Sequence, residues 1–338
     1  MDGRSDFKAA MAIVVAIVGA GFASGREVVA FFTDMGAASW LGVAAACAGA
    51  GYLCYAIMAL AQSTGADSLP ALYGRLMGAH CERAMHLVYG LLALLTGAAM
   101  LAAGGELGAL ALPTLRAREI GLALTLLASM LAAHSGVGML AALGVALAPC
   151  MAAYYGAMLV TGPPGVAIAD AGRLALAVPM GMVYAAFNAA VAGGTACLAG
   201  GLARSPARAA TWVALSLLML LVPANAALLA ADADVRRMVL PSVVLAARWG
   251  VAGYYASIAV MWMAVMTTLC AMLCSLAAQL GPLGLKPLPR LLVAGALVTL
   301  CSLAGFESLV GVGYPLMGLV CAMALMALPP FLPGRRKE

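Results

Sequence analysis

Long, unbroken apolar runs are the feature of this 338-residue chain that most restricts its fold. A helix needs about 20 consecutive apolar residues to cross a bilayer, and hydrophobic residues make up 65% of the chain. Only 9% of the residues are charged, whereas a soluble domain carries about 25%. So few charges cannot coat a water-facing surface, so the chain is expected to lie in lipid. A soluble enzyme and a nucleic-acid-binding module are thereby excluded, and the unbroken runs exclude a strand-alternating outer-membrane barrel.

Charged residues, prolines and glycine clusters divide the apolar runs into ten predicted membrane spans. These lie near 8–33, 37–62, 84–112, 117–135, 137–161, 173–199, 206–231, 248–280, 288–305 and 309–332. A Gly- and Pro-containing stretch at 162–172 halves the chain into two five-helix repeats, 1–165 and 166–338, within one integral membrane domain. An odd number of spans per repeat makes the second copy insert upside down, as in many secondary transporters. The predicted fold class is an all-α polytopic membrane protein with a five-plus-five inverted repeat, in which spans one and six are discontinuous.

The basic residues predict the orientation of these spans. With the N-terminus inside, the inner segments hold Arg4, Lys8, Arg75, Arg83, Arg204, Arg208, Lys286, Arg290, Arg335, Arg336 and Lys337. The outer segments hold Arg116, Arg118, Arg173, Arg236, Arg237 and Arg248, and Arg26 lies within a span. Because inner loops carry an excess of Lys and Arg, both termini are expected in the cytoplasm, with the protein in the inner membrane of a bacterium.

Glycines and charges interrupt the first span at 18–27, VGAGFASGRE. Each glycine weakens a helix by about 1 kcal/mol relative to alanine, and a charge at mid-bilayer costs about 2.5–3.5 kcal/mol on the insertion scale. Small residues also allow close packing of helices, but the added serine and charges favour a broken helix. Such a break must be covered by protein or line a cavity.

A break at this position predicts two kinds of binding group. The positive start of the outer half, around Ala23, Ser24 and Gly25, is suited to a carboxylate. The free carbonyls of the inner half, at 17–20 and including Ala20, are suited to a cation.

The sixth span contains a second candidate break at 184–195, YAAFNAAVAGGT. Asn188 is an amide within the membrane that either binds solute or bonds to another helix, and Tyr184 and Phe187 are its aromatic neighbours. Interruptions in corresponding spans of two halves are typical of a transporter site. We therefore add Tyr184, Phe187 and Asn188 to the predicted solute site.

Two hydroxyls and one acid are candidates for ion coupling. Thr267 and Thr268 lie near the middle of the eighth span and could complete a sodium site, although threonine also bonds to its own helix. Glu27 adjoins the first break and is a candidate gate, proton carrier or ion-pair member. For Glu106 and Glu307, also near span ends, a structural role is expected.

The remaining residues predict no cofactor and no metal beyond possible sodium. The nine cysteines lie mostly within apolar stretches, and the three histidines are scattered along the chain. No HExxH or GxSxG motif and no paired aspartates within spans are found, so the chain is not expected to be an enzyme. The stretch 232–247 is predicted to be an external loop carrying a short helix over the site.

The sequence resembles the YkvI-like family of bacterial membrane proteins in two motifs, GAGFASGREVVAFF (19–32) and YAAFN (184–188). The resemblance covers most of the chain, although Arg26 stands where many relatives carry Gln. That family is similar to the amino acid–polyamine–organocation (APC) superfamily, which implies the inverted-repeat fold of LeuT-type carriers. The resemblance implies that the solute-binding residues are Gly19, Gly21, Phe22, Ala23, Ser24 and Gly25 of span one and Tyr184, Phe187 and Asn188 of span six.

Two functions from different classes follow. The first is a secondary active transporter, or permease, that moves an amino acid or related zwitterion by alternating access and is coupled to sodium or protons. The alternative is a membrane receptor that senses a solute on a transporter fold without flux. A small-molecule solute and the lipid bilayer are the expected partners, with no nucleic acid. Substrate, coupling ion and oligomeric state are left open by the sequence.

Overall fold

The computed structural model describes residues 3–135, 149–151, 153–158, 160–161, 173–281 and 284–328. Within these ranges the chain is helical and has no strand. The first half contains α1 (Gly3–Ile17), α2 (Ala20–Ala23), α3 (Arg26–Phe31), η1 (Thr33–Ala38), α4 (Ser39–Thr64), α5 (Leu69–Met77), α6 (Ala79–Ala111) and α7 (Ala117–Ser135). The second half contains α9 (Leu174–Val191), α10 (Gly193–Leu202), α11 (Pro206–Leu229), α12 (Ala233–Arg237), α13 (Pro241–Ala246), η2 (Ala247–Trp249), α14 (Gly250–Gln279), α15 (Pro287–Ser302), α16 (Phe306–Ser308), the π-helix η4 (Leu309–Gly313) and α17 (Tyr314–Met326).

Six helical segments of the described chain are long and apolar enough to cross a membrane. They cover Thr33–Thr64, Ala79–Ala111, Leu174–Val191, Pro206–Leu229, Pro241–Gln279 and Phe306–Met326. The first predicted span is absent from this set because it is divided into three shorter helices. Most of the fifth predicted span, 137–161, and the dividing stretch 162–172 lie outside the described residues, so the two-repeat division stays a prediction.

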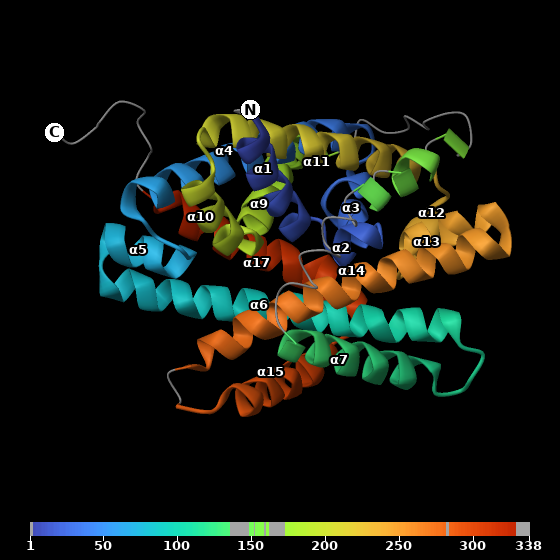
Figure 1. The fold of residues 1–338 in the computed structure, drawn as a ribbon. Coiled ribbons are helices and arrows are strands. Elements are labelled where there is room, and N and C mark those ends of the chain that lie inside the picture. The colour runs from blue at the N-terminus through green and yellow to red at the C-terminus, as the bar shows by residue number, and fades with distance from the viewer. Residues whose placement is uncertain are drawn as a thin grey trace.

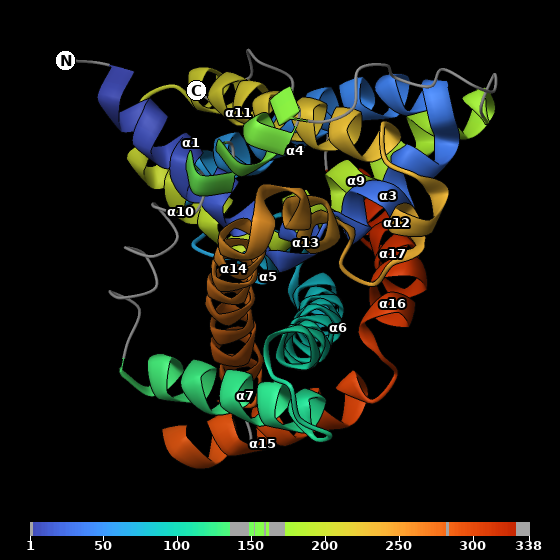
Figure 2. The same ribbon diagram turned by 90° about the vertical axis from the view of Figure 1, so that its right-hand side faces the viewer.

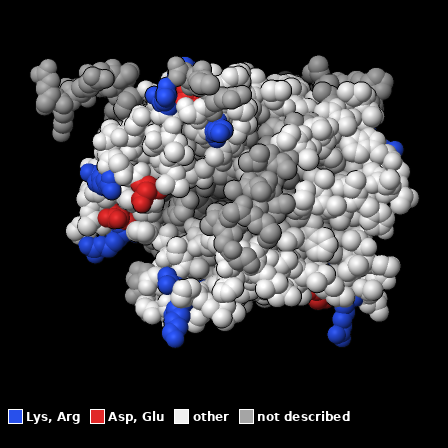
Figure 3. Space-filling model, in the orientation of Figure 1, with Lys and Arg blue, Asp and Glu red and all other residues white. Residues whose placement is uncertain are grey.

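The helices form two packed groups, and the first span touches both: α1 packs on α10 and α11 of one group, and α2 packs on α6 and α14 of the other (Figure 1). Helices α6, α7, α14 and α15 pack on one another, and α4 packs on α9, α10 and α11. Viewed from the side, α7 and α15 lie below α6 and α14, on the edge of the molecule away from α4 and α11 (Figure 2). The face seen in Figure 3 is largely free of charged side chains between its ends, as expected of a surface in contact with lipid.

Glycine allows a close helix crossing between α6 and α7. A Cβ atom on Gly121 would lie 2.6 Å from the carbonyl oxygen of Gly104 and 2.6 Å from the Cα atom of Gly108. Van der Waals packing across small residues is a main source of helix association in lipid. This crossing therefore sets the position of α7 against α6.

Replacing Gly121 by valine is expected to force α6 and α7 apart. Overpacking of this kind costs about 1–3 kcal/mol, so the apparent melting temperature of the purified protein in detergent should fall. Gly201→Val is the matched control, because Gly201 is also helical and a Cβ there meets nothing within 4 Å. Equal melting temperatures for the two variants would contradict the role given to this crossing.

Candidate functional site

The first span is broken twice in the middle of the molecule. Helix α1 ends at Ile17, α2 occupies only four residues, and α3 begins at Arg26. Gly25, between α2 and α3, has φ of 77°, in the left-handed region that glycine enters without steric cost. The break predicted at 19–25 is therefore present.

Side chains from distant segments bond the carbonyls that the break exposes. The Tyr155 hydroxyl donates to the carbonyl oxygens of Phe22 (2.7 Å) and Ala23 (3.1 Å). Ser242 of α13 donates its hydroxyl to Ala23 O at 2.6 Å and its backbone N–H to Ser24 O at 3.0 Å. Because unbonded backbone groups are costly inside a membrane protein, these bonds keep the break in place. The short helix predicted at 232–247 is present as α12 and α13, and α13 lies against the break.

Ser24 has a local role in the same segment. Its hydroxyl donates to the carbonyl oxygen of Gly21 at 2.7 Å and accepts from the backbone N–H of Arg26 at 3.0 Å. Ser24 thus bonds the end of α2 and the start of α3, and its side chain is fully buried.

Gly19 and Thr268 meet, as expected of a site between the first and eighth spans. A Cβ atom on Gly19 would lie 2.9 Å from the Thr268 hydroxyl oxygen. The Thr268 side chain therefore lies against the interruption between α1 and α2. Thr267 differs, because its hydroxyl lies 3.0 Å from the carbonyl oxygens of both Met263 and Ala264 on its own helix.

The helix of the sixth span is interrupted less than that of the first. Its helix continues through Tyr184 and Asn188, and the interruption is the single residue Ala192, with φ −81° and ψ 0°. Ala192 N still donates to Asn188 O at 2.9 Å. The Asn188 amide donates to the carbonyl oxygen of Tyr184 at 3.1 Å, a bond within its own helix. The predicted discontinuity is thus reduced to a kink four residues beyond Asn188.

Glu27 lies where these segments converge. Its side chain is buried at 4% exposure, and its Oε1 atom has no hydrogen-bond partner among the described residues. Tyr184 and Asn188 of α9 lie beside the carboxylate. A Cβ on Gly21 would overlap Glu27 Oε2 and lie 3.3 Å from the Tyr314 ring of α17. The glycine therefore makes room for the acid, and the predicted residues Gly21, Glu27, Tyr184 and Asn188 are brought together.

Aromatic rings surround this acid. Tyr184 packs edge-on against Phe31 (5.2 Å) and Phe32 (4.9 Å). The rings of Phe187 and Tyr314 are 4.5 Å apart. Phe22 packs against Tyr155 at 5.3 Å, farther along the break.

The neighbouring charge, Arg26, turns away from Glu27. Its guanidinium forms an ion pair with Glu307 of α16 at 2.6 Å and donates to the carbonyl oxygen of Arg236 at 3.2 Å. The Arg26 side chain is 15% exposed and that of Glu307 is 58% exposed, so the pair lies at the edge of the protein. Glu307 thus ties α3, the last part of the first span, to α16.

A second charged contact holds the other end of the first span. The Asp6 carboxylate of α1 accepts the backbone N–H groups of Arg204 (2.9 Å) and Ser205 (3.0 Å), and it pairs with Arg208 at 3.1 Å. Asp6 is fully buried. The carboxylate therefore ties the start of α1 to the start of α11.

Glu106 has the structural role expected of it, because it forms an ion pair with Arg118 between α6 and α7.

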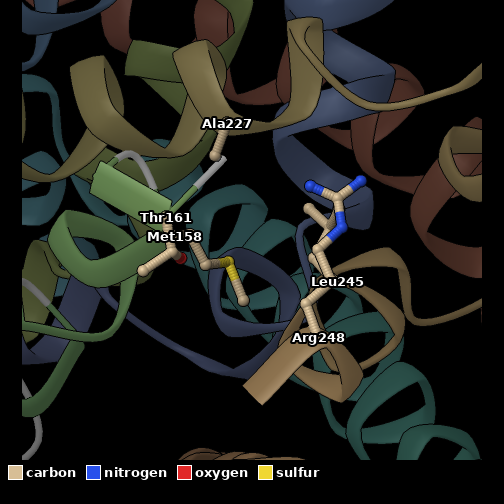
Figure 4. Close-up of a pocket in the computed structure, with 5 residues that line it drawn as sticks. All are labelled: Met158, Thr161, Ala227, Leu245 and Arg248. Atoms are coloured by element: carbon tan, nitrogen blue, oxygen red, sulfur yellow. The ribbon is translucent and has the colours of Figure 1, made fainter. Parts of the chain in front are cut away.

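A small pocket also lies beside α13, lined by Met158, Thr161, Ala227, Leu245 and Arg248 (Figure 4). Its volume of about 10 Å³ is close to that of one water molecule. The pocket is therefore too small for an organic solute.

Four residues of the site were missed from the sequence: Tyr155, Ser242, Tyr314 and Thr96. Tyr314 and Thr96 lie next to each other, and both hydroxyls are buried without a hydrogen bond of normal geometry to any described residue. A signal existed for some of them, since Thr96 is a polar residue in the middle of a predicted span and Tyr154-Tyr155 is an aromatic pair within another. Nothing in the sequence assigned them to the first-span break.

Comparison with solved structures decides the fold. The chain is similar to Mhp1 in its inward-facing conformation, with a TM-score of 0.64 and 14% sequence identity, over 95% of this chain and 75% of that chain. The fold is that of the LeuT-type transporters. Together with the six long apolar helices of the described chain, this fold supports a multi-pass membrane protein. No protein-family model and no curated protein matches the sequence.

Neutralising Glu307 is expected to loosen the first span on the side of α3. In Glu307→Gln, hydrogen exchange of peptides spanning 22–31 should rise several-fold, because Arg26 loses its ion pair and remains partly buried. The charge-swapped double variant Arg26→Glu/Glu307→Arg should restore part of the protection.

Glu106→Gln is the control for this measurement, since it removes a different ion pair of the same type. It should raise exchange near the α6–α7 connection and leave 22–31 unchanged. Unaltered exchange at 22–31 in Glu307→Gln would show that the Arg26 contact does not restrain α3.

Proposed function

We propose that this protein is a secondary active transporter that moves a small solute, an amino acid or related zwitterion, by alternating access. The observation that carries the proposal is the doubly broken first span, buried at the centre of a LeuT-type fold and held by α13 and Tyr155. A break of this kind places backbone groups and a charged side chain at mid-depth, where a solute can be bound out of contact with water.

The two charged contacts at the ends of the first span support alternating access. Asp6 holds α1 to α11, and Arg26 holds α3 to Glu307. With both contacts formed, Glu27 and Tyr184 are almost completely buried. A carrier must open each end in turn, and breaking one contact at a time would do so.

Sodium coupling is our preferred mechanism over proton coupling through Glu27. Its support is the contact between Gly19 and the Thr268 hydroxyl, at the interruption between α1 and α2. Carbonyl and hydroxyl oxygens are ligands for hard cations, and broken-helix carbonyls coordinate coupling ions in carriers of this fold. Ala20 lies at the same interruption and completes the proposed backbone ligands.

We also propose that the chain is a YkvI-like permease of a bacterial inner membrane, with both termini in the cytoplasm. The support is the motif 19–32, every residue of which lies in or beside the broken span. The basic residues Arg335, Arg336 and Lys337, which contribute to the expected orientation, lie outside the described residues.

Uptake into proteoliposomes tests the function. A panel of labelled amino acids is offered with an inward sodium gradient, with a proton gradient, and with neither. Accumulation of at least one amino acid under one of the gradients is expected. If solutes bind but are never moved under any gradient, the protein is a receptor on a transporter fold and the transporter proposal is wrong.

The sodium site is tested by Thr268→Val, which removes a hydroxyl at nearly constant size. Sodium-driven uptake should fall at least tenfold, while exchange of solute without a gradient should be retained. Thr299→Val is the matched control, because the Thr299 hydroxyl donates only to Gly295 O of its own helix α15. Undiminished sodium dependence in Thr268→Val would remove this residue from the coupling mechanism.

A further inference from the structure

Glu27 is an acid without a counter-charge. Its side chain is 96% buried, its Oε1 atom has no partner, and among the described residues no Lys, Arg or His forms an ion pair with it. The adjacent Arg26 is committed to Glu307 and Arg236. A buried carboxylate is costly unless it is paired or protonated. The site as built therefore needs either a bound proton on Glu27 or a positive charge that the described residues do not supply.

Three further oxygen atoms near Glu27 are also buried. They are the hydroxyls of Tyr184, Tyr314 and Thr96, and within the described part of the chain none of them forms a hydrogen bond of normal geometry. Tyr184 lies beside Glu27, the Tyr314 ring lies against Gly21, and Thr96 lies beside Tyr314. Buried hydroxyls in folded proteins nearly always have a partner. These atoms come from α3, α6, α9 and α17, so they form one polar cluster at the convergence of four helices.

The chemistry of the cluster selects among possible ligands. An ammonium group carries three hydrogen-bond donors and no acceptor, which complements a carboxylate oxygen and hydroxyl oxygens. The faces of aromatic rings attract such a cation, and Phe187 and Tyr314 lie together beside the cluster. A solute carboxylate, by contrast, would be repelled by Glu27. At the start of α3, the Arg26 N–H already donates to the Ser24 hydroxyl, which leaves one N–H fewer for a solute carboxylate.

We propose that Glu27 binds the ammonium group of the transported solute, with Tyr184 and Tyr314 as additional acceptors. The inference rests on the proposed transport function and narrows its substrate class to small organic ammonium compounds, with or without a carboxylate. Glu27 is thus a substrate-binding residue, distinct from the ion-coupling role considered from the sequence. Gly21 is required beside it, because any larger residue would overlap the carboxylate.

Ligand-dependent thermal stabilisation of the purified protein tests this proposal without transport. The probes are matched sets on one carbon skeleton, butylamine, 1-butanol and butyrate, together with ethanolamine, glycine and alanine. At least one ammonium compound should stabilise the wild-type protein, and the alcohol and the carboxylate of the same skeleton should not. Stabilisation by butyrate, or by no ammonium compound, would overturn the proposal.

Two substitutions of Glu27 then test whether its carboxylate is the group that binds the ammonium compound. Glu27→Gln should weaken binding of the ammonium compound about thirtyfold or more, the loss expected when one partner of a buried charge pair is removed. Glu27→Asp keeps the charge and should bind with intermediate affinity. Glu106→Gln is the matched control and should bind as the wild type does, since Glu106 pairs with Arg118. Gel-filtration profiles establish that each variant is folded.

Solute counterflow separates this role from that of a proton carrier. If Glu27 only carried a coupling proton, Glu27→Gln would still exchange labelled for unlabelled solute across the membrane without a gradient. We expect this exchange to be lost together with binding, and its retention would overturn the proposal. Binding of ammonium compounds by a wild-type protein that shows neither uptake nor counterflow would leave the assignment of Glu27 intact and overturn the transport function instead.

Discussion

The bonding of four consecutive carbonyl groups, Gly21 to Ser24, is the constraint on which the rest of the structure depends. A helix ordinarily bonds its own carbonyls, and a chain in lipid has no water to replace those bonds. Here Tyr155, Ser242 and Ser24 itself provide the donors. These donors require α13 to lie against the first span and the 153–158 segment to reach it. The positions of three separate parts of the chain therefore follow from one interruption.

Two glycines of the broken span, Gly21 and Gly25, determine where the Glu27 carboxylate lies. Gly21 leaves space that the Glu27 carboxylate occupies, and Gly25 allows the turn that directs α3 back toward α9. The result is a carboxylate at the convergence of four helices, surrounded by aromatic rings. A helix without interruption could not bring Gly21 and Glu27 into contact, because residues six positions apart lie on different faces.

The local features of the site were predictable from the sequence, and its long-range contacts were not. The break at 19–25 is predicted by the cost of glycine and charge in a span, both of which are local quantities. The meeting of Gly19 with Thr268 followed from the expected pairing of spans. The bonds from Tyr155 and Ser242 connect residues more than 130 positions apart, and no spacing rule relates them. The sixth span was predicted to break within 184–195, and Ala192 is the one described residue there that leaves the helix. Asn188, expected to bind solute or another helix, bonds to its own helix instead.

The interruption at Val18–Gly19 also has a mechanical consequence. It divides the first span into two parts, α1 and α2–α3, and each part forms a charged contact with a different neighbour, through Asp6 on one side and Arg26 on the other. Loss of one of these charged contacts need not disturb the other, since no continuous hydrogen-bonded helix joins the two parts. One part of the span can therefore lose its charged contact while the other part keeps its own.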